Sequence, residues 1–148
     1  MSIATLIHPD HIFLDLEANN RNEVINQLSD FFVEKDIVSN KENYVKAVLD
    51  REVHSTTGIG NETAIPHGKS NAVKKASIVF ARLNTPIDWE ALDDQPVKIV
   101  ILMAIPEAEK GTTHLRLLSD IAMKLMDDDT VDGLKTETRK EEIIKLLS

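Results

Sequence analysis

VKIVILMAI (residues 97–105) is apolar at every position except Lys98. A strand that packs on one face alternates apolar and polar side chains, whereas a strand covered on both faces is apolar along its length. The stretch therefore predicts a strand that is covered on both faces. ASIVFARL (76–83) predicts a second strand, and HIFLDLEA (11–18) alternates well enough to predict a third.

Helices are predicted on both sides of these strands in the chain. A capping box, in which Ser, Thr or Asn is followed three residues later by Glu, marks a helix start. It occurs at Asn20 with Glu23, Ser39 with Glu42 and Thr138 with Glu141. Apolar spacing predicts a first helix over 21–35 and a second that ends at about Arg51 or Glu52. Thr113 predicts one more cap, ahead of a helix that carries Leu115, Leu118, Ile121, Ala122, Leu125 and Met126.

The order of these elements predicts the fold class. Two helices, a group of strands and two helices follow one another with no linker or low-complexity tract between them. Segregated groups of this kind pack as layers around one sheet rather than as a repeat array. We therefore predict an α/β layer sandwich that forms a single domain over residues 1–148.

Composition excludes several classes of function. The chain has 148 residues, of which 42% are hydrophobic and none is cysteine, so a folded domain without disulfides, thiolate metal sites or a cysteine nucleophile is expected. A net charge of −8 with no basic stripe argues against a nucleic-acid partner. No signal peptide or apolar stretch of spanning length is present, which predicts a cytoplasmic protein without membrane insertion.

TGIGNETAIPHGKS (57–70) raises the question of a nucleotide site. A P-loop that ends in Gly-Lys-Ser and a dinucleotide fingerprint that starts at Gly58 both need a glycine where Thr63 stands. Pro66 also removes a backbone donor that a phosphate would use. The stretch is therefore not expected to bind a nucleotide, and TAIP reads as a short extended segment closed by Pro66.

His67 is the candidate nucleophile in this stretch. It lies between Pro66 and Gly68, which hold the imidazole at the end of an extended segment with open approach. Neutral imidazole can accept a phosphoryl group and pass it on. A loop histidine without a chemical role is the alternative, and the local sequence does not decide between them.

Two distant residues could complete a site around His67. His114 follows the predicted cap Thr113, in the first turn of a helix, where backbone N–H groups favour an anion. Arg51 ends the helix before the glycine-rich loop, and its guanidinium could bind a phosphoryl group in bidentate fashion. Each is equally explained as an ordinary helix-end residue when taken alone.

Other polar clusters carry weaker signals. His8 and His11 lack a further ligand cluster, so no metal site is predicted there. Lys69, Lys74 and Lys75 form a small basic group beside His67 in the sequence. MDDDTVD (126–132) lacks the glycine and terminal glutamate of a calcium loop and reads as a solvated turn.

These residues resemble a known family. REVHSTTGIGNETAIPHGK (51–69), IDWEALDDQPVKIVILMAIPE (87–107) and THLRLLSDIAMKLMDD (113–128) are similar to the fructose-type enzyme IIA domain of the bacterial phosphoenolpyruvate-dependent sugar phosphotransferase system. The likeness covers nearly the whole chain. Glu62 and Thr63 depart from the glycine and bulky aliphatic residue expected before AIPHG.

The resemblance implies a fold, a reaction and partners. The implied fold is a mixed central β-sheet with helices on both faces. The implied reaction is that His67 accepts a phosphoryl group from the phosphocarrier protein HPr and passes it to a cysteine of enzyme IIB. His114 is implied as a second histidine that contacts the phosphoryl group, and Arg51 as the residue that stabilises it. No cofactor, metal or nucleotide is implied.

Two other functions remain open on the sequence. A regulatory module of the same fold, as in the nitrogen-related branch of the family, would use its phosphorylation state to control binding to a target. TTGIGN (56–61) and IDWEALDDQP (87–96) resemble the sugar branch more closely. A hydrolase that pairs His67 with a carboxylate lacks the spacing of a catalytic triad.

Overall fold

The structure is a computed structural model that describes residues 2–109 and 113–148. The helices are α1 (Ile3–Leu6), η1 (a 3-10 turn, Pro9–His11), α2 (Arg21–Glu34), α3 (Lys41–His54), α4 (Thr113–Leu125), α5 (Asp128–Thr136) and α6 (Lys140–Leu147). The strands are β1 (Ile12–Leu16), β2 (Gly58–Gly60), β3 (Thr63–Ala64), β4 (His67–Ser70), β5 (Ser77–Ile87) and β6 (Val97–Pro106).

The sheet is organised around β6. On one side β6 pairs antiparallel with β5, and β5 pairs in parallel with β1. On the other side β3 and β4 pair in parallel with successive parts of β6, and β2 pairs antiparallel with β3. The mixed sheet that the family resemblance implied is confirmed, and the strand predicted over 97–105 lies at its centre.

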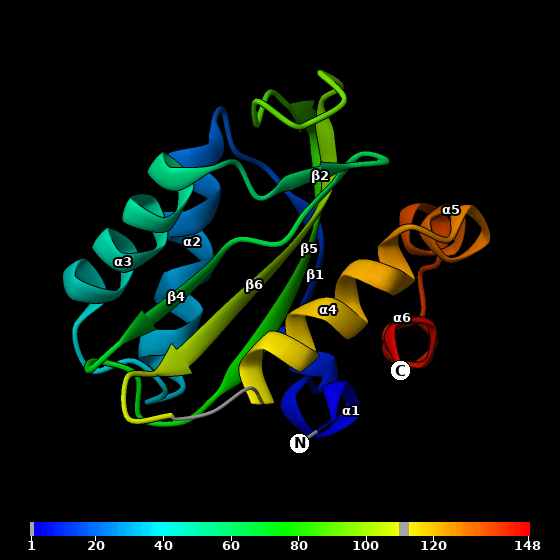
Figure 1. Cartoon of the computed structure of the whole chain (residues 1–148). Coiled ribbons are helices and arrows are strands. Elements are labelled where there is room, and N and C mark those ends of the chain that lie inside the picture. The colour runs from blue at the N-terminus through cyan, green and yellow to red at the C-terminus, as the bar shows by residue number, and fades with distance from the viewer. Residues whose placement is uncertain (1, 110–112) are drawn as a thin grey trace.

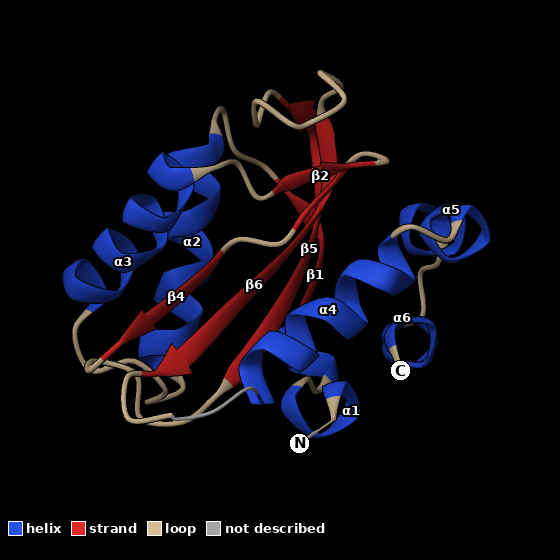
Figure 2. Cartoon of the chain, in the orientation of Figure 1, coloured by secondary structure: helices blue, strands red, loops and turns tan. Residues whose placement is uncertain are grey.

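Helices cover both faces of this sheet (Figures 1 and 2). Alternate side chains of β6 explain the two layers. Val100, Leu102 and Ala104 join one apolar cluster with α2 and α3. Ile99, Ile101, Met103 and Ile105 join the other, with the N-terminal segment and α4, α5 and α6. Each face of β6 is thus buried by its own layer of helices, which explains its apolar sequence.

Several helix starts differ from the sequence prediction. The Asn20 side chain accepts a hydrogen bond from the Glu23 N–H, so the first cap is confirmed. The second cap is Asn40 rather than Ser39, whose N–H donates to the Ala72 carbonyl oxygen instead. The predicted box at Thr138 is wrong, because α6 begins after Arg139 with no side-chain cap.

Three further predictions at helix ends differ from the structure. The stretch 126–132 is not a solvated turn, because Asp127 accepts a hydrogen bond from the Thr130 N–H and starts α5. The helix α4 begins at Thr113 itself, and the residue before it lies outside the described residues. The second helix runs to His54, past the predicted end at Arg51 or Glu52.

Gly68 allows α3 to pack closely on β4. A Cβ atom at Gly68 would lie 2.7 Å from Val48 Cγ2, 3.1 Å from the Val48 backbone nitrogen and 3.2 Å from Tyr44 Cε1. The hydroxyl of the buried Tyr44 donates a 2.8 Å hydrogen bond to the carbonyl oxygen of Met103 on β6. Any side chain at position 68 would therefore separate the helix from the strand that begins at His67.

We predict that Gly68→Ala lowers the free energy of unfolding by about 1–3 kcal/mol, because the added methyl group overpacks this contact. Urea unfolding of the purified protein measures the change. Val48→Ala removes the nearest side-chain atom. The loss of unfolding free energy in the double variant should therefore be smaller than the sum of the losses in the two single variants. Strictly additive costs would contradict the packing explanation.

Candidate active site

His67 begins a strand rather than ending one. The sequence places it at the end of the extended segment closed by Pro66, but β4 starts at His67 and pairs it with Met103 of β6. The parallel pairing of this segment with β6 is interrupted between β3 and β4. There the Pro66 carbonyl oxygen accepts a 3.0 Å hydrogen bond from the Met103 N–H. The strand β6 thus fixes the backbone on both sides of the proline, and the position of His67 follows from the sheet.

A hydrogen bond to the backbone holds the His67 ring. Its Nδ1 lies 3.0 Å from the Ile65 carbonyl oxygen. A carbonyl oxygen can only accept, so Nδ1 carries the proton in the neutral ring and Nε2 carries the free electron pair. The ring is partly buried. Nε2 is therefore the ring nitrogen of His67 with an electron pair free to attack an electrophile.

The structure brings Arg51 and His114 close enough to influence His67 electrostatically. Burial lowers the pKa of His67 below its ordinary value, and the electrostatic effects of Arg51 and His114 lower this pKa further. The hydrogen bond to Ile65 and the negative charge of Glu52 oppose that shift. Because the net shift is downward, the imidazole is neutral at pH 7 and available as a nucleophile.

Arg51 and His114 reach this region from opposite layers of the fold. Arg51 lies in the last turn of α3, and one guanidinium nitrogen donates to the Ser55 carbonyl oxygen at 2.9 Å. His114 is the second residue of α4, and its buried Nδ1 has no hydrogen-bond partner among the described residues. A helix N-terminus with an unpartnered imidazole nitrogen suits an anionic group.

Glu52 is a buried carboxylate that no motif in the sequence singles out. It accepts hydrogen bonds from the Thr57 hydroxyl, from the Thr57 N–H at 3.2 Å and from Trp89 Nε1 at 3.4 Å. Its side chain is fully buried, and Arg21 approaches it at 3.8 Å. This network ties the end of α3 to the 55–57 loop. In the sequence, a charged residue beside Arg51 looks like a surface residue, and only its contacts with Thr57 and with Trp89, 37 residues away, distinguish it.

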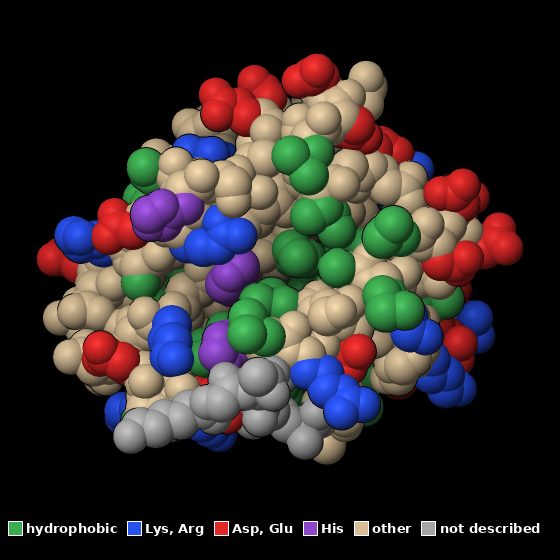
Figure 3. Space-filling model, viewed as in Figure 1, with side chains coloured by type: hydrophobic (Ala, Val, Ile, Leu, Met, Phe, Trp, Pro, Cys, Tyr) green, Lys and Arg blue, Asp and Glu red, His purple; other side chains and the backbone are tan. Residues whose placement is uncertain are grey.

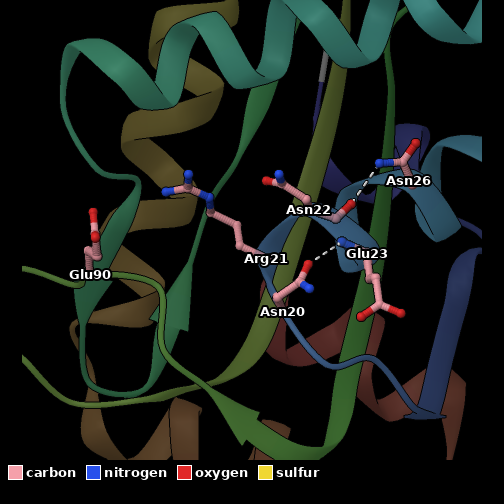
Figure 4. A pocket seen from close by; sticks show the side chains of 6 residues that line it. All are labelled: Asn20, Arg21, Asn22, Glu23, Asn26 and Glu90. Carbon is pink, nitrogen blue, oxygen red and sulfur yellow. Dashed lines mark hydrogen bonds between the residues drawn. The ribbon is translucent and has the colours of Figure 1, made fainter.

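Arg21 connects the Glu52 network to the surface. It lines a pocket of about 510 Å³ at the start of α2, together with Asn22 and Glu90. Figure 4 shows the Arg21 side chain extending between the α2 N-terminus and the segment that carries Glu90. Because Arg21 and Glu52 are of opposite charge, the guanidinium offsets part of the cost of burying the carboxylate.

The turn before His67 accommodates the two residues that depart from the family pattern. Asn61 and Glu62 have φ values of 57° and 63°, the left-handed pair of a tight hairpin between β2 and β3. Glu62 also pairs with Lys135 of α5 at 2.5 Å. The buried Thr63 hydroxyl donates to the Gly60 carbonyl oxygen at 2.8 Å. The expected glycine and aliphatic residue are thus replaced by polar residues that have their own partners.

The surface around β4 is basic and partly apolar. Figure 3 shows histidine, lysine and arginine side chains gathered on one face beside a group of hydrophobic side chains, with acidic side chains mostly at its edge. Leu115, next to His114, is 56% exposed. Such a face can accept an acidic or apolar protein surface. Among the described residues there is no group of three or more His, Asp or Glu side chains arranged to hold a metal ion.

Comparison with known proteins identifies the family. The family described as "Phosphoenolpyruvate-dependent sugar phosphotransferase system, EIIA 2" matches residues 5–148. This match defines the class of protein, a phosphoryl-carrier component of a phosphotransferase system. The chain belongs to the EIIA type 2 family of the sugar phosphotransferase system.

Similar curated proteins belong to more than one branch. The "PTS system 2-O-alpha-mannosyl-D-glycerate-specific EIIABC component" of Escherichia coli is 34% identical over 148 residues, covering 99% of this chain but only 22% of that protein. The "Nitrogen regulatory protein" of Bradyrhizobium diazoefficiens is also 34% identical, covering 100% of this chain and 95% of that protein. The "PTS system fructose-specific EIIA component" of Haloferax volcanii is 32% identical, with 99% and 94% coverage.

Solved structures share the fold. The crystal structure of nitrogen regulatory protein IIA-Ntr from Neisseria meningitidis superposes with a TM-score of 0.92 at 26% identity, covering 99% of both chains. Mannitol enzyme IIA of Escherichia coli, solved in complex with phosphorylated enzyme IIB, gives a TM-score of 0.80 at 26% identity and covers 95% of this chain and 96% of that one. A related enzyme IIA therefore binds an enzyme IIB.

None of the helices among the described residues is both long and apolar enough to cross a membrane.

We predict that His67 is neutral at pH 7, with its proton on Nδ1. Nitrogen-15 NMR of the histidine rings should give a pyridine-like shift for Nε2 and a pKa below 6.5. His11, whose Nδ1 lies 2.8 Å from the Ile78 carbonyl oxygen, is an internal reference for the same tautomer. A proton on Nε2 of His67 would contradict the assignment of the nucleophilic atom.

We also predict that Glu52→Gln lowers the free energy of unfolding by about 1–3 kcal/mol. The amide NH₂ would face N–H or O–H donors, and at least one buried donor would lose its acceptor. Chemical unfolding measures this cost. Glu42→Gln, an exposed carboxylate in the first turn of the same helix, should change stability by no more than about 0.5 kcal/mol. Equal effects of the two substitutions would mean that the Glu52 network does not stabilise the fold.

Proposed function

We propose that this chain carries a phosphoryl group on Nε2 of His67, accepting it from phosphorylated HPr and passing it to a cysteine of an enzyme IIB. The observation that carries the proposal is the hydrogen bond from Nδ1 to Ile65, which leaves Nε2 unprotonated on a partly exposed ring. The chain has no cysteine, so the acceptor thiol belongs to another protein or domain.

The proposed transfer is an in-line displacement at phosphorus. The bond from phosphorus to the donor nitrogen breaks as the bond to His67 Nε2 forms, while Nδ1 keeps its proton and its hydrogen bond. Arg51 and His114 hold the equatorial oxygens and stabilise their negative charge. In the second step the bond to Nε2 breaks as the acceptor thiolate binds phosphorus.

This relay needs no metal ion or nucleotide in our proposal. Phosphoryl transfer depends mainly on the position of the reacting atoms and on charge stabilisation. The donor already supplies an activated phosphorus–nitrogen bond. The remaining requirements are a nucleophile and groups that stabilise charge. The neutral imidazole of His67 provides the first, and the nearby Arg51 guanidinium and His114 imidazole provide the second.

Sugar uptake is the physiological role that we favour, with fructose or a related sugar as the transported substrate. The similarity to fructose-specific and mannosylglycerate-specific components supports this role. The chain spans only about a fifth of the latter, so permease and enzyme IIB functions would reside outside residues 1–148.

A regulatory role is the second candidate. It is supported by the nitrogen regulatory proteins of Bradyrhizobium diazoefficiens and Neisseria meningitidis, which match this chain over nearly their whole length. In that role the phosphorylated and unphosphorylated forms of His67 would differ in their affinity for a target protein. Transfer of phosphate from the labelled chain to a cognate enzyme IIB cysteine distinguishes the two roles, because a purely regulatory module would keep its phosphate.

We predict that His67→Ala abolishes phosphoryl acceptance. The chain is incubated with phosphoenolpyruvate, enzyme I and HPr, and its intact mass is measured before and after mild acid. The natural sequence should gain one acid-labile phosphate. Arg51→Ala and His114→Ala should be labelled more slowly, by about 10²-fold for a lost charge-stabilising donor.

His54→Ala is the matched control, since His54 is exposed on the same last turn of α3 as Arg51. It should be labelled at the rate of the natural sequence. Full labelling of His67→Ala would overturn the proposal.

A further inference from the structure

A second cavity lies away from His67, where the N-terminal segment, the end of α2 and the start of β5 meet. It has a volume of about 480 Å³, within the usual range for small-molecule sites. Its polar lining includes His8, Asp10, His11, Lys35, Lys75 and Ser77. Two of these residues, His11 and Ser77, are only 6% and 2% exposed. The cavity therefore combines a buried polar floor with charged groups at its opening.

Ser77 provides a polar group that lacks a partner. Its Oγ is buried and makes no hydrogen bond among the described residues. An unsatisfied buried hydroxyl costs about 1–3 kcal/mol, so native structures usually pair it with protein, water or ligand. Since Ser77 lines this cavity, a molecule in the cavity could accept its hydrogen bond.

His11 provides an acceptor on the same floor. Its Nδ1 lies 2.8 Å from the Ile78 carbonyl oxygen, so Nδ1 carries the proton of the neutral ring and Nε2 accepts. Burial lowers the pKa of His11, and this effect outweighs the opposing hydrogen bond to Ile78 and the charge of Asp10. The aromatic edges of His8 and Phe31 hold the ring in place at centroid distances of 5.1 and 5.0 Å.

The opening of the cavity carries more positive than negative charge, although the whole protein has a net charge of −8. Lys35 pairs with Asp10 at 2.9 Å. Lys75 makes no salt bridge within the part of the chain that the structure describes, whereas its neighbour Lys74 pairs with Asp36 and does not line the cavity. Lys35 is thus paired with one carboxylate, which leaves further N–H donors on its ammonium group, and Lys75 remains available for an anion.

From this arrangement we propose a second ligand site, which binds a phosphate monoester of a small hydroxylated molecule. The phosphate group would accept hydrogen bonds from the Lys35 and Lys75 ammonium groups and from the Ser77 hydroxyl. The hydroxyl groups of the ligand would donate to His11 Nε2 and to the Asp10 carboxylate. A bare anion would leave these two acceptors unused, and a neutral polyol would leave Lys75 without a counter-charge.

The site is separate from His67 in the fold. His11 precedes β1, and β5 and β6 lie between β1 and the β4 strand that carries His67. Ligand binding in this cavity requires no phosphoryl transfer. The proposed ligand site and the proposed relay through His67 can therefore each be wrong without affecting the other. NMR signals of His11 and His67 report the two sites separately.

The test is a titration of the isotope-labelled full chain with glycerol 3-phosphate, inorganic phosphate and glycerol at constant ionic strength. Constant salt is needed because a nonspecific attraction to lysines is screened over about 10 Å at 0.1 M. We expect saturable shifts at His11 and Ser77 with glycerol 3-phosphate, at least about 10-fold weaker binding of inorganic phosphate, and no shift with glycerol. Lys75→Ala should weaken binding about 10-fold or more, and Lys74→Ala should leave it unchanged.

Ser77→Ala provides an independent readout. It should weaken ligand binding, yet without ligand it should not lower the free energy of unfolding, because it removes an unpartnered hydroxyl. The proposal is overturned if the shifts at His11 and Ser77 are absent or do not saturate, or if Lys74→Ala weakens binding as much as Lys75→Ala. A Ser77→Ala variant that binds the ligand normally would also overturn it.

Discussion

The contact between α3 and β4 at Gly68 is the constraint on which the candidate active site depends. Only a residue without a side chain lets the Val48 backbone and the Tyr44 ring approach the strand so closely. This approach places the Tyr44 hydroxyl on the Met103 carbonyl oxygen of β6. It also sets the distance of the whole helix from the sheet. The position of Arg51, two turns after Tyr44, depends on this distance. Gly68 thus contributes to the site by fixing the distance between two elements, although it has no functional group.

The electrostatics of His67 reflect a balance of opposing charges. Arg51 and His114 disfavour the imidazolium form, whereas Glu52 and the Ile65 carbonyl oxygen favour it. In the proposed relay, the charges that keep the ring neutral before transfer would also attract the phosphoryl group after transfer. Because the folded pKa lies below the unfolded value, the folded chain binds fewer protons at His67. The stability that the neutral His67 side chain contributes is present above about pH 6.5. It is lost as the pH falls from about 6.5 through the lowered pKa of His67 in the folded state.

The sequence predicts those features whose signals are local. The strand over 97–105 could be predicted because its residues from Ile99 to Ile105 are all apolar, and the helix after Asn20 because its cap and its apolar spacing lie within one segment. The helix α5 could not be predicted, because three aspartates stand at its start and its buried residues are only Val131 and Leu134. That helix depends on packing against α6, where Gly133 faces Leu146. His67 and Arg51 could be singled out as candidates, but Glu52 could not, because its partner Trp89 lies 37 residues away.

The separation of the fold into two apolar layers has a consequence for how the candidate site assembles. Arg51 belongs to the layer that packs on Val100, Leu102 and Ala104 of β6. His114 belongs to the layer that packs on the alternate residues of the same strand. The sheet contacts both layers, and His67 is attached to it by the pairing of β4 with β6. Loosening either layer would remove one neighbour of His67 while leaving the nucleophile in place. The complete set of three residues therefore exists only when both faces of the sheet are covered.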